Sequence, residues 1–106
     1  MTMSIDVSEE AASVIRVTVA GELTTVTVNG LRTAVAGAIG GRPRAVIVDL
    51  DRVTFLDSSG IGSLIAGRHL ADAHALEYRV VNARDHVRWV LNVSGVWSYL
   101  AGDDPD

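Results

Sequence analysis

A continuous apolar run in the middle of the chain predicts its best-defined strand. Residues 45–50 read Ala-Val-Ile-Val-Asp-Leu and are rich in the β-branched residues that favour strands. Because Ile47, Val48 and Leu50 are all apolar, the run is typical of a strand that is covered on both faces.

A short polar segment after this strand predicts a turn and the start of a helix. The segment reads Asp57-Ser58-Ser59-Gly60, and these residue types favour turns and helix N-termini. Apolar residues then recur at Ile61, Leu64 and Ile65, which predicts a helix that ends near residues 73–75.

The first third of the chain predicts a hairpin of two strands. Ser4–Val7 and Ile15–Val19 are the candidate strands, and the polar segment Ser8–Glu10 is the expected connection. We expect Gly21 to end the second strand.

A helix is predicted between this hairpin and the central strand. Its apolar stripe follows helical spacing and consists of Leu31, Ala34, Val35, Ala38 and Ile39. Thr24 or Thr25 is the expected N-cap, and Gly40-Gly41 followed by Pro43 ends the helix.

The last third predicts one more strand and one more helix. Tyr78–Val81 is the strand, Asn82 is a turn residue, and Gly95 closes a helix whose stripe is Val87, Val90 and Leu91. We expect the two tryptophans, Trp89 and Trp97, to complete the core, with a partner-binding tryptophan as the alternative. Val96 and Leu100 are expected to pack back onto the core in the same way.

The order of these elements predicts a single α/β domain. Strands separated by helices imply right-handed crossovers, so we expect a mixed, mostly parallel sheet of about four to five strands flanked by helices. The first strand is then an antiparallel addition. Residues 1–100 are expected to form the domain and residues 101–106 a flexible acidic tail.

Composition narrows the function classes. The 106 residues are 48% hydrophobic and 21% charged, which fits one compact core. The chain has no cysteine, so disulfides, thiolate catalysis and cysteine-ligated metals are excluded. Its net charge is −4 and its arginines are scattered, so we expect no direct contact with nucleic acid. No signal-like or membrane-length apolar run is present, so a cytoplasmic protein without membrane insertion is expected.

Two enzymatic motifs fail at the serine pair. A hydrolase nucleophile elbow needs glycine two residues before and two residues after the serine, and neither Ser58 nor Ser59 has both. Gly60 and Gly62 begin a dinucleotide-binding pattern, but the third glycine position is Ile65 and the chain has no lysine for a phosphate-binding loop. The sequence therefore predicts no catalytic residue and no cofactor.

Metal binding has no support either. His69 and His74 are five residues apart, which does not place them together on one helical face. We expect Asp49, Asp51 and Asp57 to serve as turn and capping groups rather than as a carboxylate cluster.

The serine pair itself has two interpretations that its residues leave open. A serine at a helix start can be a simple cap, or it can be an exposed site where the partial positive charge of the helix tolerates a phosphate. Gly60, Gly62 and Ser63 are expected to keep this helix start bare, so that another protein can approach Ser58 and Ser59 closely.

Over nearly its full length the chain resembles the STAS domain of bacterial anti-sigma-factor antagonists. The most specific segment is the strand followed by Asp-Ser-Ser-Gly and a helix, because these occur together in the expected order. The matching segments are Gly21-Glu22-Leu23 with Leu31-Arg32, Val46–Leu50 with Val53-Thr54-Phe55, residues 57–62, and Val87–Gly95.

The resemblance implies a non-enzymatic regulator that controls transcription indirectly, by partner switching. Its partner is an anti-sigma factor with a histidine-kinase-like ATPase fold, which releases its sigma factor when the antagonist binds. The kinase phosphorylates a serine of the antagonist, which then dissociates, and a serine phosphatase resets it. The matching acceptor is Ser59. The implied switch region comprises Thr24, Asp57, Ser58, Gly60, Ile61, Gly62 and Ser63.

One residue departs from the family pattern. The family commonly has an acidic residue directly after Gly-Glu-Leu, and this chain has Thr24 there. Threonine keeps the capping ability but lacks the negative charge. A non-switching STAS scaffold subunit, of a signalling assembly or of a lipid-transport ATPase, is therefore the alternative function.

Overall fold

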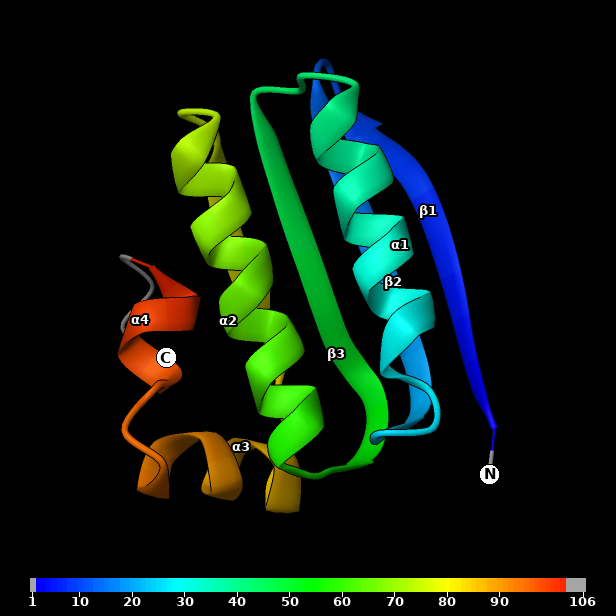
Figure 1. Cartoon of the computed structure of the whole chain (residues 1–106), viewed down its shortest axis with the longest axis vertical. Helices are drawn as coiled ribbons and strands as arrows, with labels where there is room; N and C mark the ends of the chain where they lie inside the picture. Colours follow the sequence, from blue (N-terminus) through cyan, green and yellow to red (C-terminus); the bar gives the residue numbers. More distant parts are fainter. Residues whose placement is uncertain (1, 103–106) are drawn as a thin grey trace.

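A computed structural model of the chain describes residues 2–102 and contains four strands and four helices (Figure 1). In chain order these are β1 (Met3–Ala11), β2 (Val14–Leu23), α1 (Val28–Gly40), β3 (Ala45–Leu56), α2 (Ser58–Ala73), β4 (Glu77–Val81), α3 (Asp85–Val93) and α4 (Trp97–Ala101). The outer residues of the predicted acidic tail, 103–106, lie outside the described part.

The strands form one mixed sheet in the order β1-β2-β3-β4. β1 pairs with β2 in antiparallel register, whereas β2 with β3 and β3 with β4 are parallel. The predicted α/β class, the mostly parallel sheet and the antiparallel first strand are confirmed. The helix α4 is an addition to the predicted order.

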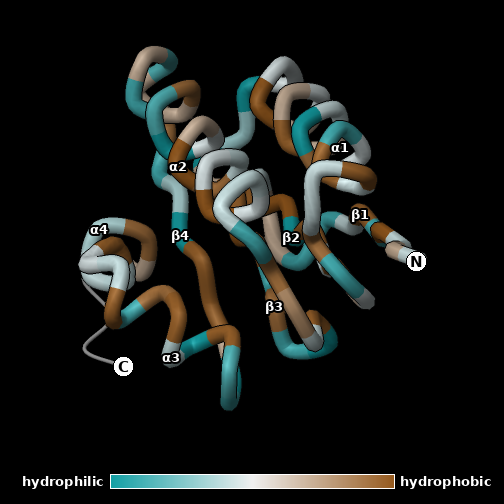
Figure 2. The backbone as a smooth tube through the Cα atoms, turned by 60° about the horizontal axis from the view of Figure 1, so that its bottom comes forward, coloured by the Kyte–Doolittle hydropathy of each residue, from teal (hydrophilic) through white to brown (hydrophobic). Residues whose placement is uncertain are grey.

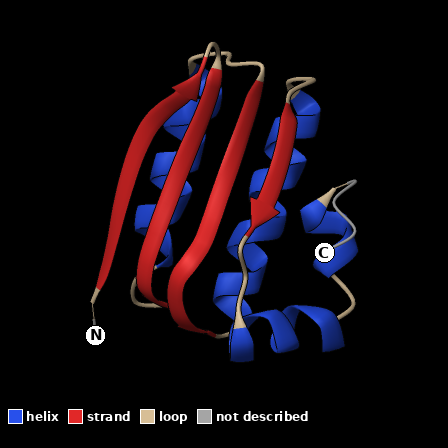
Figure 3. Cartoon of the chain, turned by 180° about the vertical axis from the view of Figure 1, so that it is seen from behind, coloured by secondary structure: helices blue, strands red, loops and turns tan. Residues whose placement is uncertain are grey.

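The two faces of the sheet differ. α1 and α2 lie side by side on one face, and the view from behind shows no helix crossing in front of the strands (Figure 3). The open face carries charged groups, among them Arg16, whose Nη1 donates to Asp49 at 3.1 Å. The expectation that β3 is covered on both faces is therefore wrong: its helix side is fully buried, but Ile47 and Asp49 on the other side are only partly buried.

The hairpin is longer than its sequence pattern indicates. β1 continues to Ala11, so Ser8–Glu10 belongs to the strand and the turn follows at residues 12–13. β2 likewise continues past Gly21 to Leu23. Gly21 has a φ of 103°, and a Cβ there would lie 2.3 Å from the carbonyl oxygen of Thr2. The glycine therefore lets β2 pass close to the backbone of Thr2 and continue, instead of ending the strand.

α1 buries the predicted apolar stripe, whereas the buried face of α2 differs from the predicted one. In α1 the buried residues include Leu31, Val35 and Ile39, as the spacing predicts. In α2 the buried face centres on Leu64 and on small residues, and Ile61 and Ile65 are only half-buried. The buried small residues are Gly60, Ser63, Gly67 and Ala71. They let α2 approach the sheet closely, and α2 contacts β4, whose later part is hydrophobic (brown in Figure 2).

Tyr78 fits into the space that Gly67 leaves. A Cβ at Gly67 would lie 2.6 Å from Tyr78 Oη, and this hydroxyl donates to the carbonyl oxygen of Leu64 at 2.9 Å. Tyr78 is 4% exposed, and burial raises the pKa of its hydroxyl well above the usual range. The neutral phenol is therefore part of the core.

Replacement of Tyr78 by phenylalanine is expected to lower the free energy of unfolding by about 1 kcal/mol at neutral pH, since one buried hydrogen bond is lost. Because the pKa of Tyr78 is raised in the folded state, its contribution is complete below about pH 10 and is lost as the pH rises further. The chain has no lysine, so few other groups titrate in that range. Urea unfolding at pH 8 and pH 11 tests this expectation. Tyr78→Phe should lose less stability than the wild type between the two pH values, and an equal loss would contradict the assignment.

The C-terminal helices close the end of the core. Trp97 and Leu100 are buried, as expected, and α4 ends at the buried Ala101. Trp89 is different, because 60% of its side chain is exposed. The expectation that both tryptophans complete the core is therefore wrong for Trp89. Among residues 2–102 no helix is both long enough and apolar enough to cross a bilayer.

Candidate functional site

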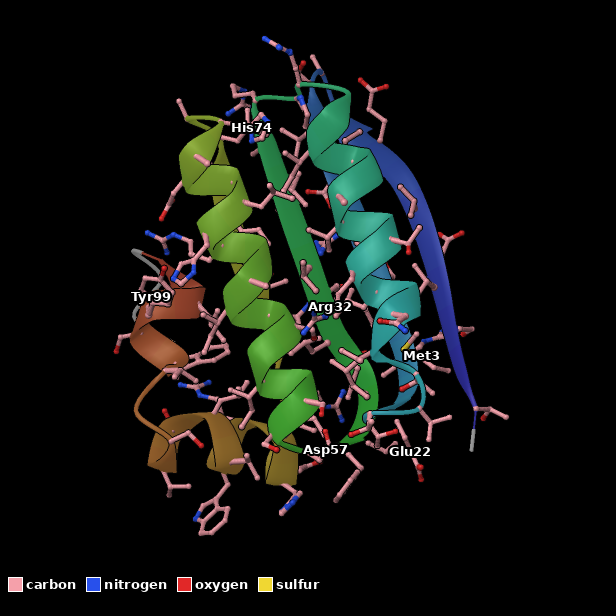
Figure 4. The ribbon with its side chains drawn as sticks, viewed as in Figure 1. Met3, Glu22, Arg32, Asp57, His74 and Tyr99 are labelled. Atoms are coloured by element: carbon pink, nitrogen blue, oxygen red, sulfur yellow. The ribbon has the colours of Figure 1, made fainter. Side chains whose placement is uncertain are left out.

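The serine pair lies at the end of the sheet where β2 and β3 end and α2 begins. Asp57 and Glu22 mark this end in Figure 4. Leu23 pairs with Leu56 at the last position of the two strands, and the Asp57 N–H donates to the carbonyl oxygen of Leu23 at 3.2 Å. The parallel pairing of β2 and β3 thus brings the 24–27 turn beside the first turn of α2.

Asp57 joins these two segments through its carboxylate. Oδ1 accepts from the Gly60 N–H at 3.1 Å, which makes Asp57 the N-cap of α2. Oδ2 accepts from the Thr25 N–H at 3.3 Å. The predicted capping role of Asp57 is confirmed, and the same side chain also holds the 24–27 turn.

Ser59 lies in the first turn of α2 and faces the 24–27 turn. Its hydroxyl hydrogen-bonds to that of Thr25 at 2.8 Å. Ser58 is exposed and Ser59 is half-buried, so both hydroxyls lie at the surface. Backbone N–H groups at a helix start carry a partial positive charge and accommodate an anion. The site is therefore suited to carry a phosphate on a serine.

Thr24 and Thr25 have different contacts in the turn. Thr24 is 6% exposed, and its Oγ1 accepts from the Val26 N–H at 3.2 Å within the turn. The neighbour of Ser59 is Thr25. Neither residue is the N-cap of α1, which is Thr27, so that expectation is wrong. The Thr27 hydroxyl instead donates to the carbonyl oxygen of Glu22 at 2.7 Å and closes the turn.

Two of the residues that were expected to keep the start of α2 accessible, Gly60 and Ser63, are themselves buried. Ser63 is 3% exposed and its hydroxyl donates to the Gly60 carbonyl at 2.7 Å. Gly60 is buried against β2, where a Cβ would lie 2.6 Å from the carbonyl oxygen of Leu23. The expectation that these two residues leave the surface open is therefore wrong, and they position the segment from inside. Ile61 and Gly62 are half-buried.

The histidines are engaged away from the serine hydroxyls. His74 Nδ1 lies 3.0 Å from the Leu70 carbonyl oxygen, and the ring of His69 packs edge-on against Tyr99. His86 stacks between two aromatic rings. Within residues 2–102 no group of three His, Cys, Asp or Glu side chains is placed to hold a metal ion.

Asp49 and Asp51 are not part of the site. They lie inside β3 rather than at its end, and they pair with arginines on the open face of the sheet. Arg84 Nη1, for example, donates to Asp51 at 2.8 Å.

One known protein family matches nearly the whole chain. The family model described as the STAS domain matches residues 6–100. A search of curated protein sequences found no significant match.

Several solved structures share the fold. An anti-sigma factor antagonist from Mycobacterium paratuberculosis is 25% identical with a TM-score of 0.81, over 99% of this chain and 87% of that one. The anti-sigma factor antagonist SpoIIAA in its unphosphorylated form is 25% identical with a TM-score of 0.76, over 89% of this chain and 84% of that one. A sulfate transporter family protein from Wolinella succinogenes has a TM-score of 0.71 at 16% identity, over 89% and 76% of the two chains, which shows the fold alone.

Proposed function

This chain belongs to the STAS domain family, and we propose that it is an anti-sigma-factor antagonist that is switched off by phosphorylation of Ser59. The observation that carries the proposal is the position of the Ser59 hydroxyl, at the surface of the first turn of α2 and 2.8 Å from that of Thr25. The similarity to two anti-sigma factor antagonists at 25% identity supports the same role. A form of SpoIIAA that is named as unphosphorylated supports a phosphorylation cycle in this family.

The partner that we propose is an anti-sigma factor with a histidine-kinase-like ATPase fold. It transfers the γ-phosphoryl group of ATP to Ser59 Oγ, ADP leaves, and the hydroxyl proton goes to a base. Asp57 is poorly placed to be that base, because each of its carboxylate oxygens already accepts a backbone N–H. The base is therefore a group of the kinase, which agrees with a chain that is a substrate rather than an enzyme.

The phosphate changes the charge of the surface without requiring a change of fold. It adds about −1.5 to −2 charges at neutral pH. The N-terminal N–H groups of α2 stabilise that charge within the chain. A partner carboxylate that faces Ser59 is repelled, so the phosphorylated chain dissociates and a serine phosphatase returns it to the binding form.

The threonine at position 24 does not leave Ser59 without a polar neighbour, since the Thr25 hydroxyl hydrogen-bonds to that of Ser59. Asp57 is then the acidic residue of the switch region, and its charge is shared with two N–H groups. We propose that the chain remains a kinase substrate for this reason.

Phosphorylation by the kinase tests the proposal directly. Each kinase-type anti-sigma factor of the source genome is incubated with the chain, ATP and magnesium. We expect one of these kinases, the cognate one, to add a single phosphate to the chain. Ser59→Ala should abolish the modification, and the matched variant Ser58→Ala should keep it. Intact-mass and peptide mass spectrometry measure both. An unmodified chain with every kinase would overturn the proposal and favour the scaffold function.

A further inference from the structure

Three aromatic rings form a continuous row at the end of the molecule that carries Ser59. The rings of Phe55 and His86 stack with centroids 6.2 Å apart and planes 9° apart. His86 stacks in turn on Trp89, at 6.0 Å and 22°. These separations lie in the range of favourable aromatic pairs. We call Phe55, His86 and Trp89 the aromatic row.

The aromatic row faces solvent. Trp89 is 60% exposed and Phe55 is 42% exposed, and Val93, one turn further along α3, is 63% exposed. Trp97 provides the contrast within the same chain, because it is 7% exposed and completes the core. An exposed stack of large rings leaves apolar surface in water, and such patches mark interaction sites.

The aromatic row begins close to Ser59. Phe55 is the last residue but one of β3 and lies opposite Glu22, and α3 packs against the same strand (Figures 1 and 3). Phe55 and Ser59 are four positions apart in the sequence, so their Cα atoms are at most about 15 Å apart. A typical protein interface covers about 800 Å² on each partner, or a circle of about 16 Å radius. A protein that brings its active site to Ser59 therefore reaches Phe55, from which the row continues through His86 to Trp89.

One pair of charges near the row is compensated. Arg84 and Asp51, at the start of α3 and on β3, neutralise each other in an ion pair of 2.8 Å. A phosphate on Ser59 acts through charge, whereas stacked rings bind through buried area. The row can thus supply affinity while Ser59 decides between binding and release.

We propose that the aromatic row is the apolar anchor for the kinase-type partner, and that it binds apolar side chains of that kinase. This inference rests on the proposed function. Aromatic residues are enriched among the few side chains that dominate interface energies. Trp89 is the largest ring of the row and is more exposed than Phe55.

Removal of the Trp89 ring tests the anchor. With the cognate kinase without ATP, Trp89→Ala should raise the dissociation constant about tenfold, whereas Trp89→Phe should stay within about threefold of the wild type. The matched control is Val7→Ala, which removes an apolar side chain that is 50% exposed on the opposite edge strand β1. It should leave the dissociation constant within about twofold. Calorimetry or surface plasmon resonance measures these values.

Three outcomes separate the anchor from the proposed function. A wild type that binds and is phosphorylated, with Trp89→Ala binding equally well, overturns the anchor alone. A wild type that no kinase binds or modifies overturns both. Self-association of the wild type that Trp89→Ala abolishes, measured by sedimentation, overturns the anchor in favour of a contact between two copies. Steady-state phosphorylation, with the chain as the varied substrate and ATP saturating, should support the anchor by showing a raised KM and an unchanged kcat in Trp89→Ala.

Discussion

Replacement of Ser59 by aspartate is expected to weaken binding of the kinase-type partner by several tens of fold while the chain stays folded. Two unit charges about 7 Å apart interact by about 2.4 kcal/mol at an effective dielectric constant near 20. One added carboxylate that faces a partner carboxylate therefore costs about that much in binding free energy. The folded state tolerates the change because Ser59 lies at the surface of a helix start, where negative charge is favourable.

Ser59→Ala and Ser58→Asp are the matched controls for this prediction. The alanine variant removes the hydroxyl without adding charge, so it should bind within a few fold of the wild type. Ser58→Asp places the same charge on the adjacent exposed position and should have a smaller effect. The loss for Ser59→Asp should shrink as salt is raised to 0.5 M, because screening weakens exposed charges. Equal dissociation constants for Ser59→Asp and Ser59→Ala would sink the charge-based release.

Replacement of Gly60 by alanine is expected to lower the free energy of unfolding by about 2–3 kcal/mol, although alanine normally stabilises a helix relative to glycine. The new Cβ would lie 2.6 Å from the carbonyl oxygen of Leu23 and 3.0 Å from Leu56 Cβ. The oxygen belongs to the backbone of β2, so the clash is relieved only by moving α2 away from the sheet. That movement also disturbs the Asp57 cap and its bond to Thr25.

Gly62→Ala is the matched control, two residues further along the same helix. Nothing lies within 4 Å of a Cβ at Gly62, so this variant should be as stable as the wild type or up to about 1 kcal/mol more stable. Urea unfolding monitored by tryptophan fluorescence compares the two variants. If Gly60→Ala proves as stable as Gly62→Ala, the close approach of α2 to Leu23 does not constrain the fold.

Much of the fold could be predicted from local patterns. The stripe of Leu31, Val35 and Ile39 predicts α1 because helical spacing is a local property. The hairpin boundaries could not be read in this way. Gly21 is a strand breaker by type, yet with its φ of 103° it lies close to the backbone of Thr2 and the strand continues. The open face of the sheet was missed because the apolar run around Ile47 does not reveal which face the helices cover.

Only the part of the site that is formed by neighbouring residues, the Asp-Ser-Ser-Gly segment, could be predicted from the sequence. Asp57 caps α2 because an N-cap is formed by residues close in sequence. The Thr25–Ser59 contact joins residues 34 apart, and it depends on the parallel pairing of β2 and β3. The burial of Gly60 and Ser63 depends on the same packing, because both lie on the side of α2 that meets the sheet and α1. The aromatic row required α3 to pack at the end of β3, and no local pattern specifies that contact.

The affinity of one partner for the same chain before and after phosphorylation tests the switch most directly. The cognate kinase modifies the chain with ATP, the phosphorylated chain is purified, and its binding to the kinase is compared with that of the unmodified chain. The added charge of about −1.5 to −2 predicts a dissociation constant that is higher by about two to three orders of magnitude. Equal affinities for the two forms would contradict the assignment of Ser59 as a phosphorylation switch.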